Sequence, residues 1–86
     1  MVSERIKAGA KIVDVRSPEE FQGGAYPGAV NIPLQVLVAR LRELPKDKPV
    51  VLYCASGARS ARGARLLKSA GYADVLNAGG LADMPA

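Results

Sequence analysis

The most informative segment of the chain reads Val50-Val51-Leu52-Tyr53-Cys54-Ala55-Ser56-Gly57-Ala58-Arg59-Ser60. The apolar, β-branched and aromatic residues 50–53 predict a short buried strand. Strong helix formers dominate residues 60–70, and Gly71 follows them, so we expect a helix that ends at this glycine. The only cysteine, Cys54, therefore lies where a strand gives way to a loop of small residues, just before a helix.

Cys54 is predicted to be a reactive nucleophile. The backbone N–H groups of the loop and the positive end of the helix dipole both favour an anion here. They lower the pKa of a thiol from its free value of about 8.5, so a partly ionised thiol is expected near neutral pH. Arg59 adds a positive charge, and Ser60 supplies a hydroxyl that can cap the helix. A single cysteine is more often an inert core residue, but these features together favour a thiolate in an anion-binding loop.

Four short motifs together resemble the rhodanese family of sulfurtransferases. The loop Cys54-x-x-Gly57-x-Arg59-Ser60 is similar to the active-site loop of that family. The other motifs are Val13-Asp14-Val15-Arg16 with Pro18-Glu19-Glu20-Phe21, then Pro27-Gly28-Ala29-Val30-Asn31-Ile32-Pro33, then Gly71-Tyr72 with Asn77-Ala78-Gly79-Gly80-Leu81. Because they occur in order over nearly the whole chain, the resemblance is specific. It looks most like the small phage-shock type of bacterial rhodanese.

The resemblance implies a thiosulfate sulfurtransferase with Cys54 as nucleophile and sulfur carrier. The thiolate would take sulfur from thiosulfate or a persulfide donor and pass it to cyanide or a thiol. The residues expected to bind the anionic donor are Ala55, Ser56, Gly57, Ala58, Arg59 and Ser60. Asp14 and Arg16 close the first strand and are expected to support the site, with Arg16 paired to Glu19 or Glu20. The sequence departs from the family pattern at Ala25, where members usually carry a histidine.

Two other functions stay open at this point. A cysteine phosphatase or arsenate reductase also places a cysteine and an arginine around N–H groups. Its loop, however, is one residue longer than the four residues between Cys54 and Arg59. A non-enzymatic persulfide carrier or docking module would share the same loop as the enzyme. Turnover with a small acceptor would separate a carrier from an enzyme.

Alternating strands and helices predict a single α/β domain over residues 1–86. The expected architecture is a small open, mainly parallel sheet flanked by helices, and the resemblance implies that it is a rhodanese-like domain. Strands are expected at residues 11–15, 29–31, 50–53 and 74–77, and helices at 2–8, 18–22, 33–44 and 60–70. Ser17 and Glu20 form a capping-box pattern at the start of the second helix. Ligands bind beyond the carboxyl ends of the strands in such sheets, where Cys54 lies.

Composition narrows the classes of function. One cysteine and no histidine among 86 residues exclude an internal disulfide and a Cys–His pair, and we expect no metal or cofactor. A net charge of +4 with few aromatic residues predicts no nucleic-acid binding. No apolar run has the length of a membrane span, and the N-terminus does not read as a signal peptide. We therefore expect a cytoplasmic protein, or a periplasmic one if a signal peptide was removed. We also expect a monomer, and a protein thiol is a further candidate partner.

Overall fold

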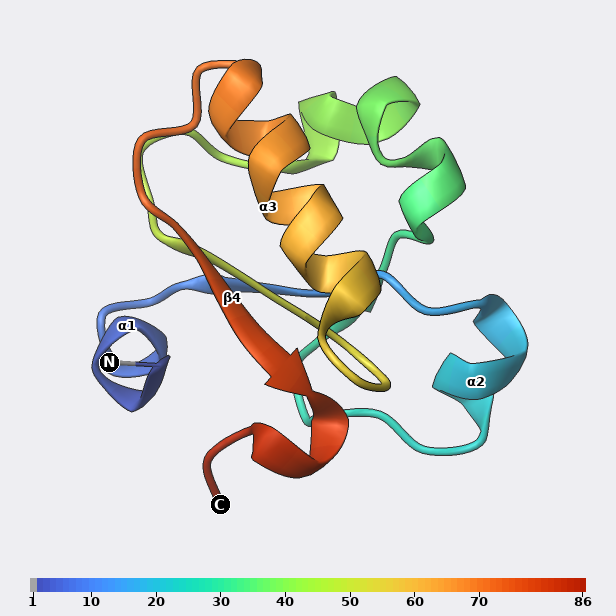
Figure 1. The fold of residues 1–86 in the computed structure, drawn as a ribbon. Helices are drawn as coiled ribbons and strands as arrows, with labels where there is room; N and C mark the ends of the chain where they lie inside the picture. The colour runs from blue at the N-terminus through green and yellow to red at the C-terminus, as the bar shows by residue number, and fades with distance from the viewer. Residues whose placement is uncertain (1) are drawn as a thin grey trace.

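A four-stranded parallel sheet organises the computed structural model, which describes residues 2–86 (Figure 1). The strands are β1 (Lys11–Asp14), β2 (Val30–Asn31), β3 (Val50–Cys54) and β4 (Val75–Gly80), in the order β2-β1-β3-β4. The helices are α1 (Val2–Lys7), α2 (Pro18–Gln22) and α3 (Ala58–Ser69), with 3₁₀ helices η1 (Leu34–Val36), η2 (Val38–Glu43) and η3 (Leu81–Asp83). Every neighbouring pair of strands is parallel, which confirms the predicted α/β class.

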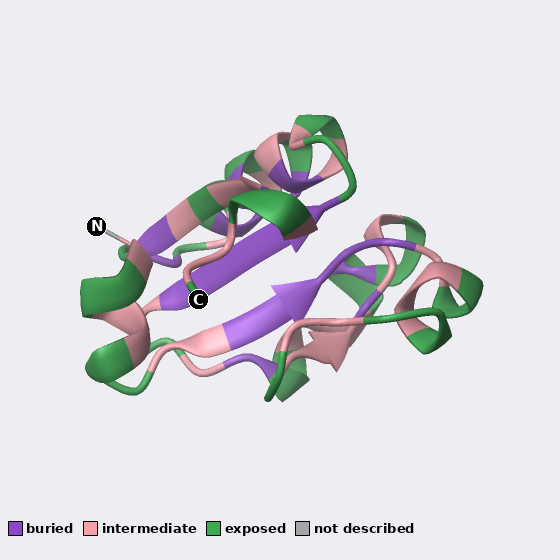
Figure 2. Ribbon diagram, turned by 90° about the horizontal axis from the view of Figure 1, so that it is seen from below, coloured by how far each residue is buried: buried purple, intermediate pink, exposed green. Residues whose placement is uncertain are grey.

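The central strand β3 lies at the middle of the hydrophobic core. All five of its residues are buried, as expected of a parallel strand covered on both faces (Figure 2). Helix α3, η1 and η2 lie on one side of the sheet, and α1 lies on the other (Figure 1). The sequence predicted this strand because its apolar run has no polar alternation. None of the helices in residues 2–86 is long and apolar enough to cross a bilayer.

The carboxyl end of α3 is closed by a pair of backbone hydrogen bonds. Gly71 N–H donates to the Lys68 carbonyl at 3.1 Å, and Tyr72 N–H donates to the Leu67 carbonyl at 3.0 Å. This is the Schellman arrangement, in which two otherwise unpaired carbonyls of the last turn are satisfied. The predicted stop at Gly71 is therefore confirmed, and the buried Tyr72 is carried back toward the core.

The predicted helix over residues 33–44 is wrong. Two 3₁₀ helices replace it, and within η2 the backbone of Arg40 leaves the helical region (φ −116°, ψ 21°). Pro33 offers no side-chain cap, and the β-branched Val36 and Val38 are poor helix formers. The Arg40–Glu43 ion pair, at 2.6 Å, joins residues three apart, which a 3₁₀ turn brings into line. Leucine periodicity alone could not distinguish this geometry from an α-helix.

The hydroxyl of Tyr72 ties the 3₁₀ segment to the end of α3. It lies 2.9 Å from the carbonyl oxygens of both Leu41 and Leu44 and shares its one proton between them. We expect Tyr72→Phe to lower the free energy of unfolding by about 1–2 kcal/mol, because both carbonyls lose their donor. Urea denaturation measures this change. Tyr26→Phe is the control, since the Tyr26 hydroxyl makes no hydrogen bond within residues 2–86, and an equal loss in both variants would contradict the assignment.

Candidate active site

Cys54 ends β3 inside a ring of hydrogen-bond donors. Its Sγ accepts the Gly57 N–H at 3.0 Å and the Ser60 N–H at 3.4 Å, and it lies 3.4 Å from Ser60 Oγ. Both N–H groups belong to the start of α3, where no helical carbonyl is available to them. The residue is 0% exposed. Ala55, Ser56 and Ala58 are exposed and form the outer surface of the loop. The predicted N–H-lined loop is therefore present.

The pKa of Cys54 is lowered to about 7. Burial by itself raises the pKa, because it penalises the charged thiolate. Hydrogen bonds to the sulfur from the Ser60 hydroxyl, and from the N–H groups of Ser60, Gly57 and Ser56, outweigh that penalty. Near neutral pH a substantial fraction of the protein thus carries a thiolate, which is the nucleophilic form of cysteine.

Ser60 is not the helix cap that the sequence suggested. Gly57, with φ +100°, occupies the cap position and has no side chain, so the helix begins at Ala58 and Ser60 is its third residue. The buried Ser60 hydroxyl lies only 2.6 Å from Asn77 Oδ1 in β4, whose oxygen also accepts the Gly79 N–H at 3.0 Å. Because a hydroxyl has one proton, this short contact competes with donation to the more distant sulfur of Cys54. The backbone N–H groups are the donors that have no competing acceptor.

A bulge in β4 brings its glycines against the loop. Leu52 pairs with Asn77 while Cys54 pairs with Gly80, so β4 has one extra residue in this interval. A Cβ on Gly80 would overlap the carbonyl oxygen of Ala55, so only glycine permits this approach. Asn77 and Gly80 were missed as site residues by sequence reasoning. The motif Asn77-Ala78-Gly79-Gly80-Leu81 could have indicated them, but in the sequence analysis it was used only as part of the family resemblance.

Arg59 lies in the first turn of α3 rather than in the loop, and Glu20 of α2 holds it. Its Nη1 and Nη2 donate to the two carboxylate oxygens of Glu20 at 2.8 and 3.1 Å, a bidentate pair. The side chains are 38% and 35% exposed. The hydrogen bond from Arg59, followed by the Ser17 N–H, lowers the pKa of Glu20 to about 2. An anion that binds Arg59 therefore competes with the Glu20 carboxylate for the guanidinium.

Comparisons with known proteins decide the family of this chain. The family model described as a rhodanese-like domain matches residues 1–83. This chain belongs to the rhodanese-like domain family. The thiosulfate sulfurtransferase PspE of Escherichia coli is 40% identical over 74 residues, covering 84% of this chain and 71% of PspE. The uncharacterised protein YqhL of Bacillus subtilis is 44% identical over 80 residues, covering 90% of this chain and 64% of YqhL, which is less than two thirds of that relative.

The fold of this rhodanese-like domain also matches solved structures. A structure described as a rhodanese with anions from Escherichia coli has 39% sequence identity and a TM-score of 0.80. The match covers 88% of this chain and 94% of that chain. At this identity the likeness extends beyond the fold to the family, and it agrees with the resemblance that the four sequence motifs carry.

Asp14 and Arg16 form a buried ion pair at the end of β1 in the rhodanese-like domain. Arg16 Nη2 lies 2.7 Å from Asp14 Oδ2 and 2.7 Å from the Gly24 carbonyl oxygen. The hydrogen bond to Asp14 raises the pKa of Arg16. The expected pairing of Arg16 with Glu19 or Glu20 is therefore wrong, because the nearer, fully buried Asp14 takes the guanidinium and Glu20 binds the active-site helix instead.

This ion pair supports the strand that carries the cysteine. The Arg16 guanidinium lies over the ring of Tyr53 at 5.6 Å, and the Tyr53 hydroxyl accepts the Tyr26 N–H at 2.9 Å. Half-buried Ala25, which replaces the usual family histidine, is thus held between two anchored neighbours, Gly24 and Tyr26. Neither Asp14 nor Arg16 hydrogen-bonds to the sulfur. Within residues 2–86, no cluster of three or more metal-ligating side chains is present.

The competition for the Ser60 proton gives a test of the site. We expect Asn77→Ala to lower the pKa of Cys54, because the Ser60 hydroxyl loses its nearest acceptor at 2.6 Å, and only the Gly57 and Gly79 carbonyls, at 3.2 and 3.3 Å, still compete with the thiolate for its proton. Ser60→Ala should raise it by about one pH unit, the worth of one hydrogen bond to a charged group. In the double variant Ser60→Ala/Asn77→Ala, the pKa of Cys54 should equal that in Ser60→Ala alone. Thiolate absorbance against pH measures each value, with Cys54→Ser as the blank, and a raised pKa in Asn77→Ala would contradict this arrangement.

Proposed function

We propose that this rhodanese-like domain is a sulfurtransferase that moves sulfane sulfur through a persulfide on Cys54. The observation that carries the proposal is a sole cysteine whose sulfur accepts backbone N–H groups at the start of a helix. The relative PspE, named as a thiosulfate sulfurtransferase, supports thiosulfate as the donor. The anions in the Escherichia coli rhodanese structure agree with an anionic substrate.

The reaction has two half-steps that share one loop. In the first, the Cys54 thiolate attacks the outer sulfur of thiosulfate, a new S–S bond forms, and sulfite leaves with the electrons of the old one. In the second, a thiolate or cyanide attacks the terminal sulfur of the persulfide, and Cys54 leaves as a thiolate. The N–H groups of Gly57 and Ser60 stabilise negative charge on sulfur in both steps. No proton relay is needed, because every leaving group departs as an anion.

A single substitution tests the covalent step. Cys54→Ser should abolish sulfur transfer from thiosulfate to cyanide, because the chain has no second cysteine. Intact mass after incubation with thiosulfate should show one added sulfur in the parent protein, removable by a reductant, and none in the variant. Circular dichroism controls for folding. A persulfide that forms without turnover would indicate a carrier instead of an enzyme, and substantial activity in well-folded Cys54→Ser protein would end the covalent mechanism.

Arg59 is proposed to bind the dianionic donor in exchange for part of its contact with Glu20. Arg59→Ala should weaken thiosulfate use about tenfold to a hundredfold, mostly through KM, because a charge-assisted contact is worth roughly 1.5–3 kcal/mol. Arg59→Lys should restore only part of the lost thiosulfate use, since lysine lacks the planar guanidinium that can bind an anion through two N–H groups. Glu20→Gln keeps a capping residue in the first turn of α2 and should lower KM, because it loosens the carboxylate's hold on Arg59.

Steady-state kinetics across pH separate this role from an effect on the nucleophile. If Arg59 binds the donor, KM changes while the pH midpoint of the rate stays close to that of the parent protein. An unchanged KM in Arg59→Ala, together with a strongly raised thiol pKa, would assign Arg59 to the support of the Cys54 thiolate.

A further inference from the structure

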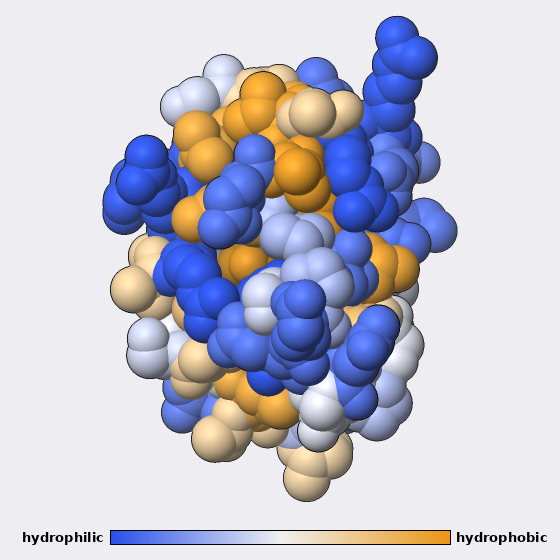
Figure 3. All heavy atoms as spheres, turned by 90° about the vertical axis from the view of Figure 1, so that its right-hand side faces the viewer, coloured by the Kyte–Doolittle hydropathy of each residue, from blue (hydrophilic) through white to orange (hydrophobic). Residues whose placement is uncertain are grey.

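A groove opens beside the active-site helix, between α3 and the 3₁₀ segments η1 and η2. Its volume is about 460 Å³, and its lining consists of Leu34, Gln35, Val38, Arg59, Arg62 and Leu66. Val38 is 60% exposed, although valine is usually buried. Figure 3 shows hydrophobic side chains gathered in the upper part of this face, with hydrophilic atoms around them. We call these six residues the apolar–basic groove.

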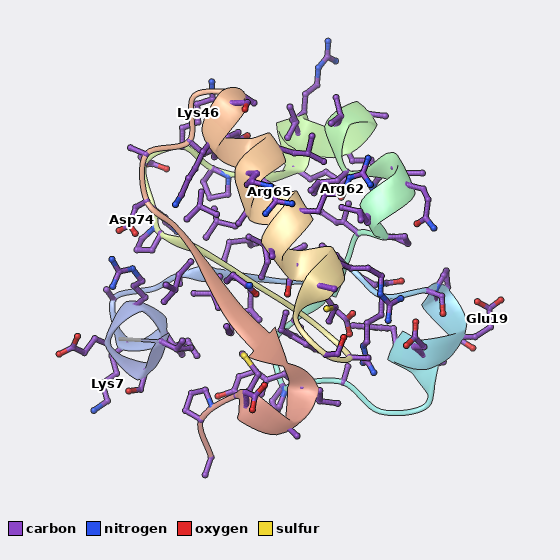
Figure 4. All side chains as sticks on the ribbon, in the orientation of Figure 1. Lys7, Glu19, Lys46, Arg62, Arg65 and Asp74 are labelled. Atoms are coloured by element: carbon purple, nitrogen blue, oxygen red, sulfur yellow. The ribbon has the colours of Figure 1, made fainter. Side chains whose placement is uncertain are left out.

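The charged side chains that line the groove are both basic, and both belong to α3. Arg59 and Arg62 stand one helical turn apart on α3, and Arg59 is also held at the mouth of the cysteine loop by Glu20. Arg62 is exposed and makes no ion pair within residues 2–86. Figure 4 shows Arg62 on the side of α3 that faces the 3₁₀ segments, whereas Arg65 lies on the front of the helix. The groove therefore offers an unneutralised cation next to aliphatic side chains.

The charges around the cysteine loop favour one direction of approach. Exposed Glu19 lies on α2, and the Glu20 carboxylate of the same helix is bound to Arg59, so Arg62 is the groove arginine whose charge is not offset. An acidic ligand is repelled by the α2 carboxylates and attracted by Arg62. The groove is also larger than a small inorganic donor requires, and no aromatic residue lines it for stacking against a nucleobase.

We propose that the apolar–basic groove docks an acidic segment with aliphatic side chains on the protein thiol that accepts sulfur from Cys54. This inference rests on the proposed sulfurtransferase function. The acceptor's leucines or valines would pack on Leu34, Val38 and Leu66, and its carboxylates would pair with Arg62 and Arg59. Its thiolate attacks the outer sulfur of the Cys54 persulfide, the S–S bond breaks, and Cys54 leaves as a thiolate while the acceptor becomes the persulfide.

Binding of synthetic peptides tests the groove independently of activity. The first probe is a fluorescent peptide in which one serine, in place of the acceptor cysteine, is flanked by glutamates and leucines. A matched peptide carries lysines instead of the glutamates. We expect the acidic peptide to bind the full chain about tenfold more tightly than the basic one, and less so at high salt. Arg62→Glu should remove that preference, whereas the control Arg65→Glu should change affinity by less than about twofold.

Sulfur transfer to the cysteine forms of the same peptides tests the acceptor role. With thiosulfate as donor, Arg62→Glu should reduce transfer to the acidic peptide about tenfold more than transfer to dithiothreitol. Equal effects of Arg62→Glu and Arg65→Glu on binding, or no preference between the peptides, would overturn the groove as a docking site. An oligonucleotide that displaces the acidic peptide and binds with the same dependence on Arg62 would overturn the choice of a protein partner. If the acidic peptide binds but no acceptor receives sulfur, the groove stands as a docking site and the sulfurtransferase function is refuted.

Discussion

The structure depends on one constraint, the placement of a sulfur atom within 3.0 Å of a backbone N–H at the buried end of a parallel strand. Strand β3 delivers Cys54 to that point because every residue of the strand is buried and its register is fixed by neighbours on both sides. Helix α3 then starts at Ala58, four residues later, and the unpaired N–H groups of Gly57 and Ser60 point at the sulfur. A bulge in β4 closes the remaining side.

The polar groups around that point are buried but paired. Asp14, Arg16 and Ser60 are the buried polar side chains of the described region, and no buried side-chain nitrogen or oxygen in residues 2–86 lacks a partner. A buried charge without a partner would cost several kcal/mol. The Asp14–Arg16 pair instead links β1 to the ring of Tyr53, immediately before the cysteine. The strand end is thus fixed by a polar network on one side and by apolar packing on the other.

Local rules were enough to predict most of the fold and the centre of the site. A continuous β-branched run favours a buried strand, a capping box favours the start of a helix, and a glycine after helix formers favours its end. These patterns predicted β3, α2 and the end of α3. The 3₁₀ segments could not be predicted, because the leucine spacing is shared with an α-helix and one of the contacts that support them comes from Tyr72, far along the chain. Asn77 and Glu20 were missed as site residues for the same reason. Their contacts with Ser60 and Arg59 join residues 17 and 39 positions apart.

The cover over Cys54 has a consequence for oxidation. A thiol with a pKa of about 7 is normally vulnerable to peroxide, since the thiolate is the form that is oxidised. With no second cysteine in the chain, a sulfenic acid formed here has no internal thiol to trap it as a disulfide before it is oxidised irreversibly. The sulfur is, however, 0% exposed beneath its own loop. The N–H groups that lower the pKa of the thiol also hold the loop over the sulfur, so the same contacts limit the access of peroxide to it.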